Sequence, residues 1–293
     1  MSLPLACFSA LFCVFSRTFL NLVDRVIFGQ RKIDFCSALF WNAMHPFAIA
    51  LFFCSLSSSI DGSLFLEPVC IYNGLAAQLT AASFSLAFRF MPIRSVVASA
   101  KVADFLIPLA CFSITQKLSS TSLIFNQLSA CAFFPLGYLA IKQKTIHFSA
   151  ASFLIGCLLI QGALSSAFQI PEKSSSFAGF SQLILAILGW RTIFAAIPLF
   201  FSKLTFESEN LSLKSISTLF IRGVLAYLSQ ASFFFCILFD HSFLAWPILN
   251  ASPLFACCAA AVFLKEEIGS VELRSALGLC IIFGFYIFIH WRN

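Results

Sequence analysis

Ten segments of about twenty mostly apolar residues follow one another along the chain, separated only by short polar breaks. A helix needs about 20 mainly apolar residues to cross the hydrocarbon core of a bilayer. The segments lie at 2–22, 36–55, 68–88, 95–115, 121–141, 148–168, 179–201, 217–239, 242–264 and 270–290. The sequence therefore predicts an all-α integral membrane protein with ten transmembrane helices, and no break is long enough to form a soluble domain.

The composition agrees with this prediction and excludes several other classes. Only 10% of the residues are charged, whereas soluble domains carry about 25%. The twelve cysteines include no C-x-x-C motif and lie almost entirely in apolar runs, so we expect neither a disulfide framework nor a metal site. The basic residues are dispersed between apolar segments, so nucleic acid is not an expected partner, and no cofactor is expected.

The two halves of the chain are similar. A shift of 149 residues lays Trp41 on Trp190 and the segment 74–84 on 223–233, where six of eleven residues are identical. Because each half holds five helices, an odd number, the second copy must enter the membrane the other way up. We therefore expect two inverted repeats, residues 1–147 and 148–293, with a binding site at their interface near the middle of the membrane.

Four short motifs follow one another in the second half. They are Arg222-Gly223, Ser252-Pro253, Leu264 with Glu266, and Gly278 with Gly284. In this order they resemble the end of the EamA-type carriers of the drug/metabolite transporter superfamily. The resemblance implies a multi-pass carrier in a cell membrane, specifically a bacterial inner membrane, with both termini in the cytoplasm. The distribution of Lys and Arg instead puts both termini outside, so the orientation stays open.

Three ionisable residues lie at membrane depth. Lys101 and Asp104 are three residues apart and share one face of a helix. They form either a buried structural ion pair or part of a transport pathway. Arg191 lies in the middle of its segment, and its guanidinium stays charged, so it needs an anion, a carbonyl or water. We expect Arg191 to face a cavity and to be the principal site residue.

Further candidates come from polar and aromatic residues within the segments. His45 serves either as a proton relay or as a satisfied polar group, and Asn250 shares a helix stripe with Trp246. Arg17 is interpreted as reaching to the membrane interface, and Arg222 as a family feature near a helix start. The full set of substrate-binding candidates is Lys101, Asp104, Arg191, Asn250, Trp41, Trp190, Trp246, His45, Gln78, Tyr227 and Gln230.

These residues favour a secondary carrier over an enzyme. Interior cations, one interior acid and three tryptophans suit a small polar metabolite with an anionic group plus an amine or an aromatic ring. The resemblance implies amino acids or amino-acid-derived and nucleoside-bearing compounds such as S-adenosylmethionine. The chain has no Walker A motif, so a proton gradient or a counter-substrate would drive transport. The alternatives are an exporter of amphipathic or drug-like cations, a membrane enzyme, and a scaffold without turnover.

Overall fold

The structure, a computed structural model, describes only part of the chain. The described residues are 3–30, 35–57, 62–115, 131, 134–167, 177–201, 213–238, 252–265, 270–271, 274–275, 277–278 and 281–282. This part is all-helical and contains no strand, which confirms the predicted α class. Trp246 and Asn250, and most of the predicted spans 121–141 and 270–290, lie outside the described residues.

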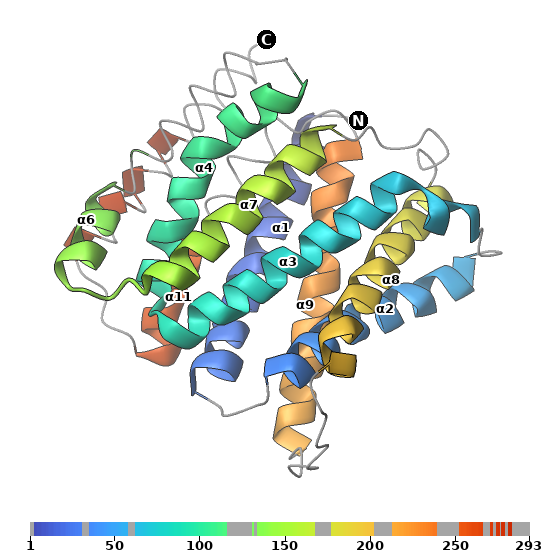
Figure 1. Ribbon diagram of the computed structural model, residues 1–293, viewed down its shortest axis with the longest axis horizontal. Helices are drawn as coiled ribbons and strands as arrows, with labels where there is room; N and C mark the ends of the chain where they lie inside the picture. The colour runs from blue at the N-terminus through green and yellow to red at the C-terminus, as the bar shows by residue number, and fades with distance from the viewer. Residues whose placement is uncertain are drawn as a thin grey trace.

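The helices follow the apolar segments closely (Figure 1). They are α1 (Leu3–Asp24), α2 (Phe35–Ser57), α3 (Pro68–Phe90), α4 (Ile93–Thr115), α6 (Phe134–Lys142), α7 (Phe148–Ala167), α8 (Phe177–Phe201), α9 (Leu213–Leu238) and α11 (Ser252–Leu264). A π-helical turn, η1 (Arg25–Gln30), follows α1, and a 3₁₀ turn, η2 (Gly62–Leu66), precedes α3. Within the described residues, three stretches are long and apolar enough to cross a membrane, namely Phe35–Leu56, Pro68–Phe90 and Ala178–Pro198.

Proline sets both ends of α3. Pro68 stands at the first position of the helix, where its missing N–H leaves no hydrogen bond unmade. At the other end Met91 is extended, and its N–H donates to the carbonyl of Ala87. Pro92 follows, and the residue before a proline is disfavoured in the α region. The chain therefore leaves α3 and begins α4 at Ile93.

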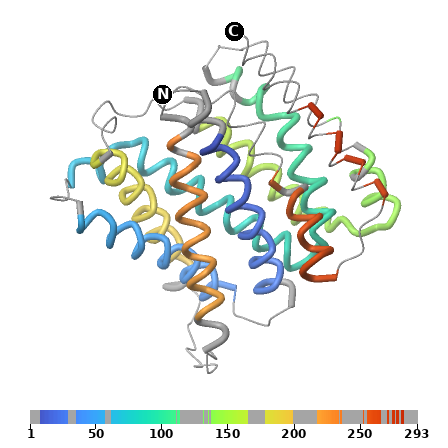
Figure 2. The backbone as a smooth tube through the Cα atoms, turned by 180° about the vertical axis from the view of Figure 1, so that it is seen from behind, coloured from blue at the N-terminus to red at the C-terminus, as the bar shows by residue number. Residues whose placement is uncertain are grey.

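The helices pack in a bundle whose neighbours are distant in sequence. Helix α7 packs against both α3 and α4, and α8 packs against α2 and α3 (Figure 1). Helix α1 lies beside α9 and α11, as the view from behind shows (Figure 2). Two glycines allow close approach, as in many membrane bundles. A Cβ at Gly74 would lie 2.6 Å from the Cβ of Trp190, and one at Gly223 would overlap His45.

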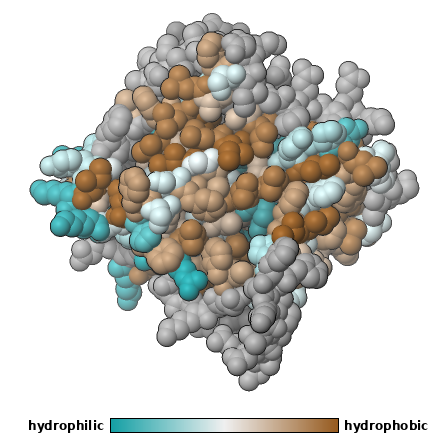
Figure 3. All heavy atoms as spheres, viewed as in Figure 1, coloured by the Kyte–Doolittle hydropathy of each residue, from teal (hydrophilic) through white to brown (hydrophobic). Residues whose placement is uncertain are grey.

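The outer surface of the bundle is apolar. Large hydrophobic side chains such as Phe148, Phe8 and Val262 are among the most exposed in the described part, and apolar residues cover much of the face in Figure 3. Exposed apolar surface of this extent marks contact with a membrane or a partner. Together with the three long apolar helices, it indicates a membrane protein.

Candidate functional site

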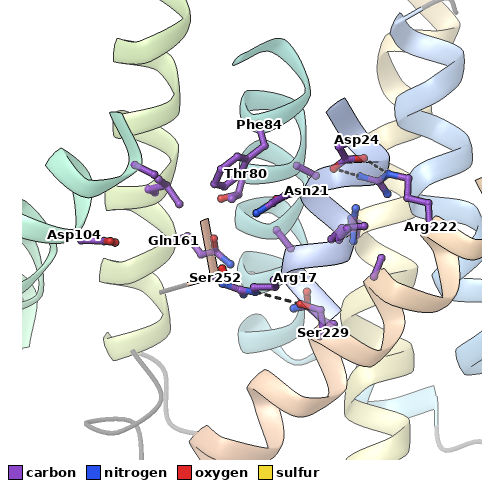
Figure 4. Close-up of a pocket in the computed structure, with 18 of the residues that line it drawn as sticks. Arg17, Asn21, Asp24, Thr80, Phe84, Asp104, Gln161, Arg222, Ser229 and Ser252 are labelled. Carbon is purple, nitrogen blue, oxygen red and sulfur yellow. Dashed lines mark hydrogen bonds and ion pairs between the residues drawn. The ribbon is translucent and has the colours of Figure 1, made fainter. Parts of the chain in front are cut away.

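A cavity of about 120 Å³ lies inside the bundle, with room for several water molecules. Helices α1, α3, α4, α7, α8, α9 and α11 all contribute to its wall (Figure 4). Its polar lining consists of Arg17, Asn21, Asp24, Thr80, Asp104, Gln161, Arg191, Arg222, Ser229, Gln230 and Ser252. Five of these residues are ionisable, and a wet cavity is where charged groups at membrane depth are tolerated.

A bidentate ion pair between Arg222 and Asp24 forms one part of the cavity wall (Figure 4). Arg222 on α9 donates through Nη2 to Oδ2 of Asp24 on α1 at 3.0 Å, and its Nε donates to Oδ1 of the same carboxylate. Arg222 is only 2% exposed, and its Nη1 also donates to the carbonyl of Asn42 at 3.5 Å. The parallel geometry is the strong form of an arginine–carboxylate pair, and it ties α9 to α1.

Arg222 lies well inside α9, whose first residue is Leu213. The sequence interpretation placed it near a helix start because the apolar segment begins later, at residue 217. Helix α9 continues through polar residues ahead of that segment. Arg222 therefore lies within the helix, away from its first residue, and lines the cavity.

A second ion pair lies across the cavity, on α4. Nζ of Lys101 and Oδ2 of Asp104 are 2.8 Å apart, and both side chains are buried. Asp104 also lines the cavity and points toward its interior in Figure 4. The two sequence-based alternatives are thus compatible, because the residues form a buried pair and the acid is part of the cavity wall.

Arg17 and Arg191 reach the cavity without a carboxylate partner among the described residues. Nε of Arg17 donates to Oγ of Ser229 at 3.1 Å, and its guanidinium lies 5.3 Å from the ring centre of Phe233, a cation–π distance. Nε of Arg191, which is 5% exposed, donates to Oε1 of Gln78 at 3.4 Å. Arg17 was interpreted as reaching to the membrane interface, but it points into the bundle.

Thr80 contributes a polar atom that has no hydrogen bond. Its hydroxyl is buried and lacks a partner within the described structure, although Thr80 is on the cavity wall. Most buried polar atoms in proteins are paired, so an unpaired one calls for a water or a ligand. In Figure 4 the Thr80 side chain lies between Phe84 and the polar groups of α1.

The cavity thus gathers some of the predicted site residues and leaves others elsewhere. Asp104, Arg191 and Gln230 line it. Lys101 and Gln78 are not part of the wall, but Lys101 pairs with Asp104 and Gln78 accepts a hydrogen bond from Arg191.

Four aromatic candidates, Trp41, His45, Trp190 and Tyr227, lie away from the cavity wall. The Nδ1 atom of His45 is 2.8 Å from the carbonyl of Trp41, so it has a local hydrogen-bond partner. Nε1 of Trp190 donates to the carbonyl of Phe65 at 2.7 Å, and Tyr227 stacks on Phe53. His45, Trp190 and Tyr227 thus pack between helices, whereas Trp41 is exposed on α2.

Three charged residues of the wall stand outside the predicted site: Arg17 and Arg222, which were given other interpretations, and Asp24, which was not considered. The signal that would have found them is the one that selected Arg191. An ionisable side chain within or at the end of an apolar segment needs a partner or a wet cavity. Within the described part of the chain, no group of three or more His, Cys, Asp and Glu residues is placed to hold a metal ion.

No family model matches the sequence, and no curated protein matches it. Among the solved structures that match in fold, one described as "Crystal structure of protein" superposes with a TM-score of 0.68. The match covers 99% of this chain and 99% of that one, at 13% sequence identity. At this identity the similarity concerns the fold alone.

Proposed function

We propose that the protein is a secondary carrier of a small polar metabolite that bears an anionic group, and that it is similar to the EamA-type carriers. The observation that carries this proposal is the charge of the cavity. Its wall holds three arginines and two carboxylates among the described residues, so positive charge is in excess. A cation exporter is less compatible with this excess, because it would bring a further positive charge into the cavity.

The proposal includes ten membrane spans in two inverted repeats, residues 1–147 and 148–293. Its main support is a contact between α2 and α8. Oγ1 of Thr192 donates to the carbonyl of Ala43 at 3.1 Å, and these residues are 149 positions apart, the same shift that aligns the two halves. Around a two-fold axis, a residue on the axis contacts its own counterpart.

Several other helix contacts agree with this two-fold arrangement. Under this shift α1, α2, α3 and α4 correspond to α7, α8, α9 and the region of α11. Helix α1 packs on α9 as α3 packs on α7, and α2 packs on α9 as α3 packs on α8. The matched glycines agree, because Gly74 approaches Trp190 on α8 and Gly223 approaches His45 on α2.

Matched positions also meet at the cavity. Three aligned pairs on α3 and α9 line its wall, namely Ala77 with Ala226, Thr80 with Ser229, and Ala81 with Gln230. The cavity is thus shared between the two halves. This is where carriers built from inverted repeats bind their substrates, and rocking of one repeat against the other would expose the cavity to each side in turn.

The ion pair between the two proposed repeats would change during this cycle. The Arg222–Asp24 pair joins the two proposed repeats, so its rupture or formation would accompany the rocking motion. Amino acids and amino-acid-derived or nucleoside-bearing compounds remain the substrates that the resemblance suggests. A proton gradient or a counter-substrate would supply the energy.

Uptake into proteoliposomes tests the proposal. The purified chain is first screened for ligands by thermal shift, since a ligand that binds the folded state raises its apparent stability. A ligand found in this way is then followed as radiolabelled uptake, with Arg191→Gln compared with Lys142→Gln, a change at an exposed residue on α6. We expect saturable uptake that Arg191→Gln abolishes and Lys142→Gln leaves intact. Non-saturable uptake that is equal in all three proteins would refute the carrier.

A further inference from the structure

The ion pairs divide the cavity charges into two groups. Arg222 is neutralised by Asp24, and Lys101 by Asp104. Arg17 and Arg191 remain, and neither forms an ion pair within the described structure. The cavity and the pairs that border it therefore carry two uncompensated positive charges.

Both of these arginines have donors to spare. A guanidinium offers five N–H groups, and each arginine donates only through its Nε to an oxygen atom of a described residue. Arg17 also contacts the Cys13 thiol. The terminal nitrogens form the fork that binds a carboxylate or phosphate in bidentate fashion, and they donate to no oxygen of the described residues. Each arginine is thus able to hold one acidic group.

The two arginines belong to different walls of the cavity. Arg17 comes from α1 and is held on α9 by Ser229, whereas Arg191 comes from α8 and is held on α3 by Gln78. Ser229 has an aligned counterpart on α3, Thr80. The Ser229 hydroxyl accepts from Arg17, whereas the Thr80 hydroxyl has no partner in the described structure. Thr80 lines the cavity, but its hydroxyl oxygen is buried away from it.

The charge of the two arginines favours a ligand with a particular number of acidic groups. Arg191 is buried and Arg17 is half-buried, so both guanidiniums have lost hydration that an acidic group would replace. A ligand with one acidic group would leave one guanidinium uncompensated, and a zwitterion would add an ammonium to the cavity. A ligand with two acidic groups would neutralise both arginines without breaking either ion pair of the wall.

We infer that the substrate is a small dianion, whose two acidic groups bind Arg17 of α1 and Arg191 of α8 at the wall of the cavity. This inference rests on the proposed carrier function. It names a substrate class, compact compounds with two acidic groups, that is narrower than the polar metabolites considered above.

Binding to the purified full-length protein tests the inference with matched probes. Succinate carries two carboxylates, and butyrate has the same carbon chain with one. Because hydrogen bonds to a charged group are strong, we expect succinate to bind about 10- to 100-fold more tightly than butyrate in calorimetry. Equal affinities, or tighter binding of butyrate, would overturn the inference.

Variants assign the two acidic groups to the two arginines. Arg17→Gln and Arg191→Gln should each bring the affinity for succinate close to that for butyrate, whereas Arg17→Lys and Arg191→Lys keep the charge and should keep a preference for succinate. The matched control is Arg89→Gln, at an exposed arginine near the end of α3, which should bind like wild type. A succinate preference that survives both glutamine substitutions refutes the assignment. If the glutamine variants do not fold, the wild-type comparison of succinate with butyrate decides.

The outcomes separate this inference from the carrier proposal. If monoacids or zwitterions are taken up saturably and succinate neither binds nor competes, the dianion inference fails and the carrier stands. If no compound of any charge binds or is taken up, both fail. Saturable uptake that succinate inhibits and butyrate does not inhibit supports both.

Discussion

Breaking the ion pair between α1 and α9 should destabilise the protein strongly. Asp24→Asn leaves the guanidinium of Arg222 charged in a site where it is 2% exposed. The asparagine amide keeps at most one of the two hydrogen bonds that Nε and Nη2 now make. Removing one partner of a buried pair typically costs about 3–5 kcal/mol, since the remaining charge is buried without compensation. We expect Asp24→Asn to lower the free energy of unfolding by this amount.

The double variant Asp24→Asn with Arg222→Met separates charge from packing. Methionine fills much of the volume of the arginine stem and carries no charge. The double variant leaves no charge in the site, so it should recover the part of the stability that Asp24→Asn loses to the uncompensated charge. The buried asparagine amide, left without its guanidinium partner, keeps a cost of about 1–3 kcal/mol. The coupling between the two sites should be large and visible in a double-mutant cycle.

Unfolding in detergent micelles, followed by intrinsic fluorescence, measures the four proteins of the cycle. Lys142→Gln serves as the control, because Lys142 is exposed at the end of α6. The reasoning is refuted if Asp24→Asn is as stable as wild type. It is also refuted if the double variant is no more stable than Asp24→Asn, because the loss would then not arise from an uncompensated charge.

Three further predictions concern packing, charge and topology. Gly74→Ala should cost about 1–3 kcal/mol in unfolding measurements, because the added methyl group overlaps Trp190, whereas Gly156→Ala, which meets open space, should not destabilise. Lys101→Met should cost about 3–5 kcal/mol in the same assay because it leaves the buried carboxylate of Asp104 without its ion-pair partner. Protease sites inserted at Gly62 and at Gln143 should be cut from opposite faces of sealed vesicles, and cutting from one face would contradict the ten-span topology.

The helices of the described part could be predicted within a few residues. The segment 36–55 corresponds to Phe35–Ser57, and 95–115 corresponds to Ile93–Thr115. The agreement has a physical origin, because a buried or lipid-facing helix must be apolar along its whole length, while the breaks carry polar or proline residues. Where a helix continues through polar residues, as α9 does ahead of residue 217, the apolar run misplaces its start.

The cavity could be predicted only in part. Asp104 and Arg191 line it, and the cost of a charge at membrane depth was enough to select them. That cost does not reveal which partner a charge will find. Arg222 and Asp24 are separated by 198 positions, and their pairing depends on the contact between α1 and α9. A histidine or tryptophan within an apolar segment is a weaker indication of a cavity, because a local hydrogen bond can satisfy its ring nitrogen. In His45 that partner is the carbonyl of Trp41, one turn earlier in the same helix.

The internal alignment held a signal for Arg222 that a residue-by-residue search does not use. The shift of 149 places Arg191 on Asn42 and Arg222 on Asn73. In each aligned pair one half supplies a cation and the other a neutral amide. In the structure Arg222 donates to the carbonyl of Asn42, the counterpart of Arg191. In the proposed two-fold arrangement, aligned positions of the two halves lie close to each other. A charged residue chosen in one half therefore makes the residues that contact its aligned position candidates as well. Both cations come from the second half of the chain and both amides from the first, so in the proposed two-fold arrangement the charges would be distributed asymmetrically between the repeats.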